Sequence, residues 1–308
     1  MTIVLFGWGS IGKRHADILR RHWPAHKLYV FRSRPAKPNA LGLPELRRWS
    51  QVKALKADAA FITNPTHRHV PTALRCARLG MHLFIEKPLS DRMAGVAALK
   101  GLCRRKRLSC YVAYCLRFHP VIKRIKTLLK GKMVHHARVV CASHLGQWRP
   151  KFNKATSYSA HRRMGGGVIL DLSHEFDYVA YLFGGIRRLQ ASAGRRAKVT
   201  VDAEDYVDAL VETRSGVPVN VHVNFLSEHL QRTIDIDVQG GFIHGDLNAC
   251  RLDYIYRGRK QSFAYAASRN RHLLEQTRYF FKHLGRPMPW NGLDESAGFL
   301  RQMLTIRP

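Results

Sequence analysis

Three glycines near the start of the chain have the spacing of a phosphate-binding turn. The motif comprises these glycines and the two residues between the last two: Gly7, Gly9, Ser10, Ile11 and Gly12. It follows an apolar run at 2–6 and opens a stretch with a helical pattern. In such a strand–turn–helix unit the glycines allow a tight turn, close approach of a pyrophosphate and close packing, and the helix N-terminus binds the anion. The pattern indicates dinucleotide binding, and the alternative is a glycine turn with a purely structural role.

A second apolar run, at 28–31, ends in Arg32, Ser33 and Arg34. An acidic residue about 20 residues past the glycines would bind the ribose hydroxyls of NAD. Two guanidinium groups and a hydroxyl suit a phosphate dianion instead. We therefore predict NADP(H) as the cofactor. NAD(H) is the alternative, in case the two arginines only share in the general basicity of the chain.

Lys87 stands before a proline, directly after the apolar run at 82–85 and Glu86. Ligands of open α/β sheets bind outside the carboxyl ends of the strands. A lysine there can hydrogen bond a substrate hydroxyl or carbonyl and stabilise developing negative charge. We expect Glu86 to hold the ammonium group in place. The alternative is a surface turn at 86–88.

Asp171 and His174 stand three residues apart in a predicted helix that follows three glycines at 165–167. Side chains at this spacing project from one face of a helix, and Asp177 continues the row. A histidine held by a carboxylate suits proton transfer near neutral pH. The pattern therefore indicates an acid/base site, and the alternative is a buried, hydrogen-bonded His–Asp pair.

The hydrophobic pattern predicts the elements that position these residues. Apolar runs typical of buried strands occur at 2–6, 28–31, 59–63, 82–85 and 110–114. Helical stretches alternate with them, which predicts a parallel sheet with crossover helices. After about residue 117 the pattern becomes period-2, most clearly at 219–225, as in a sheet with two unlike faces. We expect an α/β protein with an N-terminal Rossmann dinucleotide-binding domain at 1–117 and a C-terminal α/β domain at 118–308 with a large, mainly antiparallel open sheet.

Several segments resemble the Gfo/Idh/MocA family, named after glucose–fructose oxidoreductase and inositol dehydrogenase. In chain order they read GWGSIGKRH at 7–15, TNPTHRH at 63–69, EKPLS at 86–90, YCLRFHP at 114–120 and GGGVILDLSHEFD at 165–177. The resemblance extends over nearly the whole chain, and the EKP tripeptide and the glycine-rich segment are its most specific parts. SYSA at 157–160 and DLSHEFDY resemble a branch associated with bacterial sugar biosynthesis.

The resemblance implies reversible hydride transfer between a nicotinamide cofactor, which we expect to be NADP(H), and a carbon of a sugar or nucleotide-linked sugar. It places an Asp/His pair beside the nicotinamide, with the EKP lysine completing the site. In the oxidative direction His174 would remove the hydroxyl proton, Lys87 would stabilise the oxygen and Asp171 would orient the imidazole. The residues it adds to the cofactor site are Asn64, Pro65, His69, Glu86 and Lys87. The candidate substrate contacts are Tyr114, Arg117, His119, Tyr158 and Arg162.

The sequence departs from the family pattern at two places. The commoner spacing puts the histidine four residues after the aspartate, whereas His174 follows Asp171 by three. Cys115 stands where the family usually has asparagine. These departures leave a second hypothesis open, in which the protein is a catalytically inactive dinucleotide-binding regulatory or scaffold protein of the same fold.

The net charge suggests a third hypothesis, in which the protein binds nucleic acid. The chain has 52 Lys and Arg against 21 Asp and Glu, a formal net charge of +31. Such an excess attracts polyanions, phosphorylated substrates and anionic surfaces. It is spread over both halves, and short basic runs such as 104–107 are typical of solvated helix and loop faces. We therefore do not expect a nucleic-acid partner.

The remaining sequence features concern the compartment and the assembly. The six cysteines form no CxxC pair and fit no zinc pattern, so we expect free thiols and no metal site. The apolar run at the N-terminus is too short for a signal peptide, and no stretch of eighteen apolar residues occurs. We expect a cytoplasmic protein with no membrane association. The open sheet could support a homodimer or homotetramer.

Overall fold

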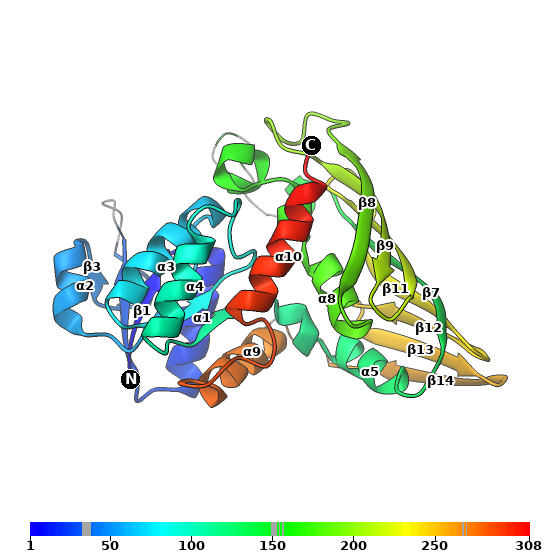
Figure 1. Cartoon of the computed structure of the whole chain (residues 1–308), viewed down its shortest axis with the longest axis horizontal. Coiled ribbons are helices and arrows are strands. Elements are labelled where there is room, and N and C mark those ends of the chain that lie inside the picture. Colours follow the sequence, from blue (N-terminus) through cyan, green and yellow to red (C-terminus); the bar gives the residue numbers. More distant parts are fainter. Residues whose placement is uncertain (33–37, 149–152, 154, 156, 267, 269) are drawn as a thin grey trace. The chain divides into compact units, whose positions relative to one another are not determined.

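The computed structural model describes residues 1–32, 38–148, 153, 155, 157–266, 268 and 270–308. The chain forms two compact units, each with its own sheet (Figure 1). Unit 1 comprises Met1–Tyr114 and Leu273–Arg301, and unit 2 comprises Cys115–His272 and Gln302–Pro308.

Unit 1 contains a six-stranded parallel sheet. Its strands are β1 (Thr2–Phe6), β2 (Lys27–Phe31), β3 (Glu45–Leu46), β4 (Ala59–Ile62), β5 (His82–Ile85) and β6 (Cys110–Val112). The strand order is β3-β2-β1-β4-β5-β6, the order of a dinucleotide-binding Rossmann sheet. The predicted parallel sheet is thus confirmed, and the short strand β3 is an element that the hydrophobic pattern did not predict.

Helices surround this sheet. They are α1 (Ser10–His22), α2 (Trp49–Leu55), α3 (His69–Arg78), α4 (Val96–Arg105) and most of α9 (Arg271–Lys282) and α10 (Leu293–Thr305). Phe61 of β4 and Phe84 of β5 stack with ring centroids 4.4 Å apart, and Phe280 of α9 meets both rings edge-on at 5.8 and 5.4 Å. Tyr111 of β6 also donates a hydrogen bond to Gln276. This aromatic core is why Leu273–Arg301 belongs to unit 1, a return that no sequence pattern predicted.

Unit 2 contains an eight-stranded sheet. Its strands are β7 (Val134–Ala142), β8 (Ile186–Gly194), β9 (Tyr206–Thr213), β10 (Pro218–Asn224), β11 (Gln231–Val238), β12 (Gly241–Asp246), β13 (Arg251–Tyr256) and β14 (Arg259–Ala264). The order is β14-β13-β12-β11-β7-β10-β9-β8, and only the β7–β10 pair is parallel. The predicted mainly antiparallel sheet is confirmed.

Two helices of unit 2, α5 (Pro120–Leu128) and α8 (His174–Leu182), pack against one face of this sheet (Figure 1). β9 contacts the short helix α7 (Val168–Asp171), and its residues alternate: Val207, Ala209 and Val211 are buried whereas Asp208 and Leu210 are exposed. The shorter helices are α6 (Leu145–Trp148) and α7 (Val168–Asp171).

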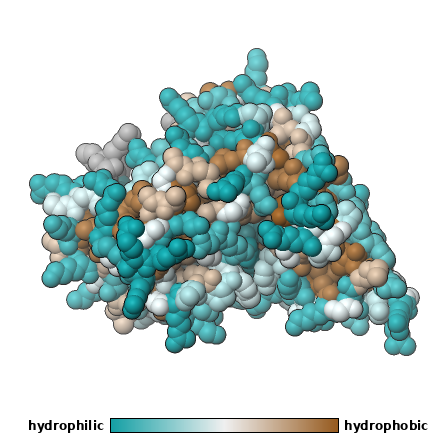
Figure 2. All heavy atoms as spheres, in the orientation of Figure 1, coloured by the Kyte–Doolittle hydropathy of each residue, from teal (hydrophilic) through white to brown (hydrophobic). Residues whose placement is uncertain are grey.

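The face of the molecule that Figure 2 shows is mainly polar. Hydrophilic residues cover most of the face shown in Figure 2, in keeping with the charge of the chain. Across the part of the chain that the structure describes, every helix is too short or too polar to cross a lipid bilayer.

Candidate functional site

The glycine turn connects β1 to α1 and is closely packed except at its middle. Gly7 has φ +120°, and a Cβ atom there would lie 2.7 Å from the backbone N of Asn64. A Cβ atom on Gly12 would lie 2.4 Å from the carbonyl oxygen of Gly7, whereas one on Gly9 would meet nothing within 4 Å. The first and third glycines are therefore required by packing, and the second leaves open space beside the backbone.

The N-terminus of α1 lies beside this open space. Its first turn contains no acidic residue, and Gly9 provides no side chain to cap the free N–H groups. Ser10 is exposed and Ile11 is half-buried at the helix start. A helix end of this kind attracts an anion through its N–H groups and its dipole. These residues therefore fit a dinucleotide pyrophosphate.

The EKP segment follows β5 and is held to the glycine helix. Glu86 is buried, and its Oε1 lies 2.7 Å from Nε2 of His15 on α1. Its Oε2 accepts the backbone N–H of Lys87 at 3.3 Å. His15 is a residue that sequence reasoning did not select, although it stands in the GWGSIGKRH segment. The contacts of Glu86 fix the backbone at half-buried Lys87, and its expected role at the Lys87 ammonium stays a prediction.

His69 is buried and joins this segment to the one that follows β4. Its Nδ1 lies 2.8 Å from the carbonyl oxygen of Pro88, and its Nε2 lies 2.8 Å from that of Asn64. Burial lowers the pKa of His69. The Asn64 side chain donates to Thr72, and Pro65 is half-buried beside it. His69 thus connects two loops at the carboxyl edge of the sheet.

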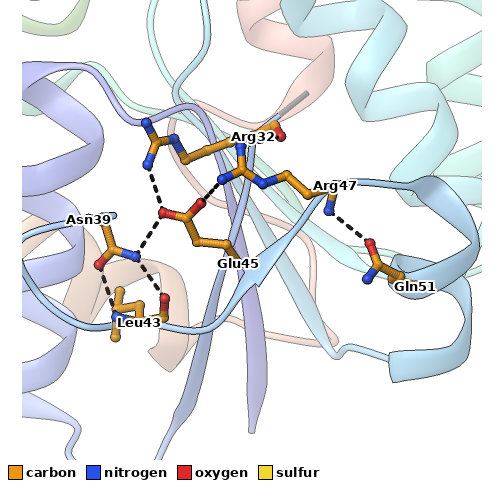
Figure 3. A network of polar contacts seen from close by, with 6 residues as sticks. All are labelled: Arg32, Asn39, Leu43, Glu45, Arg47 and Gln51. Atoms are coloured by element: carbon orange, nitrogen blue, oxygen red, sulfur yellow. Dashed lines mark hydrogen bonds and ion pairs between the residues drawn. The ribbon is translucent and has the colours of Figure 1, made fainter. Parts of the chain in front are cut away.

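A polar network lies at the carboxyl ends of the parallel strands β2 and β3 (Figure 3). The Glu45 carboxylate accepts hydrogen bonds from Nη1 of Arg32 at 2.7 Å and from Nη2 of Arg47 at 2.5 Å. Glu45 and Arg47 were missed because β3 is too short to show a strand pattern. Of the three residues assigned to a cofactor phosphate, Ser33 and Arg34 lie outside the described residues.

In unit 2 the glycine-rich segment forms two helices. We expected one continuous helix, but α7 ends at Asp171, and α8 begins at His174 after Leu172 and Ser173. The break between the two helices has a local cause. The Ser173 hydroxyl donates a hydrogen bond to the carbonyl oxygen of Leu170, and the chain turns there. The two site residues therefore stand at a helix end and a helix start.

Asp171 is held by two hydroxyl groups. Its Oδ1 accepts a hydrogen bond from the Tyr158 hydroxyl at 2.9 Å, and its Oδ2 accepts one from the Ser159 hydroxyl at 2.5 Å. Asp171 and Ser159 are buried, whereas Tyr158 and His174 are half-buried. The structure thus brings together Asp171 and Tyr158, which were selected separately, and adds Ser159, which was missed.

Two ion pairs, one part-buried and one fully buried, support α8 immediately after His174. Glu175 accepts a hydrogen bond from Nε of Arg232 on β11 at 2.7 Å. Asp177 accepts two from the Arg117 guanidinium, at 2.9 and 2.7 Å. Arg117, a candidate substrate contact, is only 4% exposed. In this unit it anchors the helix that carries His174.

The other candidate substrate contacts have varied surroundings. Tyr114, the last residue of the first stretch of unit 1, is buried with its ring edge-on to Phe299. Arg162 is exposed, and its backbone N–H donates to Asp202. His119 is buried at the start of α5, with Nε2 lying 3.7 Å from the Cys250 sulfur.

His119 makes stability depend on pH. Burial, and then the charge of Arg232, lowers its pKa from 6.5 to about 4. The unfolded chain binds this proton near pH 6.5 and the folded chain only near pH 4, so the stabilisation is complete above pH 6.5 and is lost as the pH falls through this window. We expect His119→Gln to reduce the acid-induced loss by up to about 3 kcal/mol, measured by urea unfolding at about pH 7 and about pH 4.5. The prediction would be contradicted if His119→Gln lost as much unfolding free energy on acidification as the wild type. It would also be contradicted if the exposed control His229→Gln reduced that loss by the same amount as His119→Gln.

All six cysteines lie among the described residues, where they are buried and form no disulfide bonds. Over the described ranges, no three His, Cys, Asp or Glu side chains are grouped as metal ligands.

Two family models match the chain. The model for an oxidoreductase family with an NAD-binding Rossmann fold matches residues 1–114, and the model for the GFO/IDH/MocA C-terminal domain matches residues 122–244.

Individual relatives are distant. The chain is 25% identical over 221 residues to inositol 2-dehydrogenase of Rhizobium meliloti. This aligned region covers 69% of this chain and 65% of that protein. It is 27% identical over 173 residues to dTDP-3,4-didehydro-2,6-dideoxy-alpha-D-glucose 3-reductase of Streptomyces violaceoruber, covering 56% and 49%. The matches thus span less than two thirds of these curated relatives. A solved structure of levoglucosan dehydrogenase with NADH and L-sorbose has a TM-score of 0.86 at 16% identity, covering 99% of this chain and 95% of that one, and shows the same fold.

Proposed function

Because the chain belongs to the Gfo/Idh/MocA family of NAD-binding oxidoreductases, we propose that it transfers a hydride between NADP(H) and a carbon of a sugar or nucleotide-linked sugar. The glycine turn carries this proposal, since Gly7 and Gly12 are closely packed and Gly9 leaves open space at the uncapped start of α1. This is the arrangement that a bound pyrophosphate needs.

The names of the relatives support the substrate class. One acts on inositol and another on a dTDP-linked deoxysugar, as their names state. Both substrates carry ring carbons bonded to oxygen, where a hydride and a proton move together. The two relatives thus share a ring carbon that bears a hydroxyl or keto oxygen, and such carbons are what a sugar or nucleotide-linked sugar offers.

Three side chains of this protein would handle the proton and the oxygen. We assign the acid/base role to His174, which would take the hydroxyl proton in the oxidative direction. The Lys87 ammonium would stabilise the negative charge that develops on the oxygen. Asp171, held by Tyr158 and Ser159, would orient the imidazole.

The preference for NADP(H) rests on the arginines after β2. The end of β2 offers the Arg32 guanidinium where an NAD-selective site would have a carboxylate, and Arg47 adds a second guanidinium from beyond β3. A phosphate dianion binds well between two such groups.

We expect the purified protein to bind NADPH at least about tenfold more tightly than NADH. Fluorescence titration of both nucleotides measures this ratio. Turnover with NADP(H) is then measured on a panel of inositols, sugars and nucleotide-linked sugars. NADH bound as tightly as NADPH would refute the preference, and nucleotide binding with no turnover on the panel would favour an inactive scaffold.

A further inference from the structure

We propose that Glu45 sets the selectivity of the protein between NADP(H) and NAD(H), because its carboxylate competes with an adenosine 2′-phosphate for the guanidinium groups of Arg32 and Arg47. The inference rests on the proposed function, since it concerns the cofactor site of that activity. To that site, where we had already placed Arg32, it adds Arg47 and the carboxylate of Glu45.

Three charged side chains meet at one place in unit 1 (Figure 3). β2 and β3 pair in parallel, with Val30 opposite Glu45, so both strands reach their carboxyl ends together. Arg32 directly follows β2, and Arg47 directly follows β3. Nη1 of Arg47 also lies 3.4 Å from the carbonyl oxygen of Arg32. The carboxyl edge of a Rossmann sheet is where the adenosine ribose binds, so this cluster is placed to contact its 2′ position.

Glu45 neutralises part of the positive charge in this cluster. It bonds through Oε1 to Arg32 and through Oε2 to Arg47, so each oxygen holds one guanidinium. The side chains of Arg32 and Glu45 are each 14% exposed, whereas that of Arg47 is 39% exposed. The pair formed with Arg32 is therefore the more shielded from water, and the Arg47 guanidinium is the more accessible to a ligand.

The position of the Glu45 carboxylate is fixed. The Asn39 amide donates to Oε1 of Glu45 at 3.0 Å, and Asn39 is itself held by the backbone N–H and carbonyl of Leu43. The hydrogen bond from Asn39, followed by that from Arg32, lowers the pKa of Glu45. Glu45 is therefore anionic at neutral pH and cannot turn away from the arginines without breaking several contacts.

A 2′-phosphate and the Glu45 carboxylate would repel each other while binding the same two cations. A 2′-hydroxyl carries no charge, so NAD(H) meets no such repulsion and can donate a hydrogen bond to a carboxylate. Glu45 thus weakens the binding of NADP(H) selectively. Its removal takes the carboxylate away from both guanidinium groups.

The test is isothermal titration calorimetry, which measures the affinity of the Glu45→Gln variant and of the wild-type protein for NADP⁺, NAD⁺, 2′,5′-ADP and 5′-AMP at one salt concentration. Glutamine keeps the shape and the hydrogen-bonding capacity of the side chain and removes the charge. We expect the variant to bind NADP⁺ and 2′,5′-ADP about tenfold more tightly, while its affinity for NAD⁺ and 5′-AMP changes by less than about twofold. Glu212→Gln is the matched control, because Glu212 pairs with Arg187 on the sheet of unit 2.

An unchanged NADP⁺ to NAD⁺ ratio in Glu45→Gln would overturn the inference, as would a weaker affinity for all four ligands. If that variant does not fold, the Arg47→Gln variant is measured instead. We expect it to bind NADP⁺ about tenfold more weakly than the wild type and to bind NAD⁺ with unchanged affinity. An equal loss for both nucleotides, or no loss, would overturn the inference. A wild-type protein that binds neither nucleotide would instead refute the proposed function.

Discussion

Replacing His174 with asparagine is expected to lower turnover at least about 100-fold and to leave NADPH affinity within about twofold of wild type. The physical reason is that asparagine occupies a similar volume but has no group that exchanges a proton near neutral pH. His174 is the first residue of α8, and the ion pairs of Glu175 and Asp177 hold that helix independently of the imidazole. The fold should therefore tolerate the change.

Steady-state kinetics with the best substrate of the panel measures this effect as kcat and KM separately. A loss in kcat with an unchanged melting temperature supports the proton-transfer role. His229→Asn is the matched control, because His229 is an exposed histidine in the same unit. Wild-type turnover in His174→Asn would refute the assignment.

Replacing Lys87 with alanine is expected to lower turnover about 100-fold as well. The ammonium group would be lost from the oxygen whose charge develops during the reaction, while the backbone at Lys87 would still be fixed by Glu86 and His15. Binding of NADPH should remain nearly intact, because the glycine turn and the α1 N-terminus are unchanged.

Lys87→Arg separates charge from geometry, since a guanidinium keeps the charge but cannot occupy the position of an ammonium group. We expect it to recover only part of the lost turnover. Lys53→Ala, on the exposed side of α2, is the matched control for removing a lysine from unit 1. Turnover of Lys87→Ala close to that of the wild type would rule out a catalytic role for this lysine.

The regular part of the fold could be predicted because its signals are local. The runs that became β1, β2, β4, β5 and β6 are continuous apolar segments bounded by polar residues, and their alternation with helices fixes a parallel sheet. The period-2 pattern at 219–225 likewise marks a strand with unlike faces, and β10 is that strand. Motif spacing located Gly7, Gly9 and Gly12 for a similar reason, since each has a distinct steric task within a few residues.

The parts that could not be predicted depend either on contacts distant in sequence or on a single side-chain hydrogen bond. Glu45 and Arg47 reach the end of β2 only because a strand of two residues pairs with it. Ser159 joins the site through a hydrogen bond to Asp171, twelve positions later in the chain, and the SYSA segment that contains it predicts no such contact. The break between α7 and α8 depends on a local hydroxyl bond of Ser173, which a helical hydrophobic pattern does not reveal.

The return of Leu273–Arg301 to unit 1 has a consequence for synthesis on the ribosome. Phe61 and Phe84 are synthesised early in translation. Phe280, whose ring meets both of them edge-on, is synthesised only after all eight strands of unit 2. Phe280 can therefore cover the aromatic face of the first 114 residues only after the second sheet has been synthesised. Because exposed apolar surface promotes aggregation, this face is where a nascent chain would most need a chaperone, and a stop codon before residue 273 would leave it permanently open.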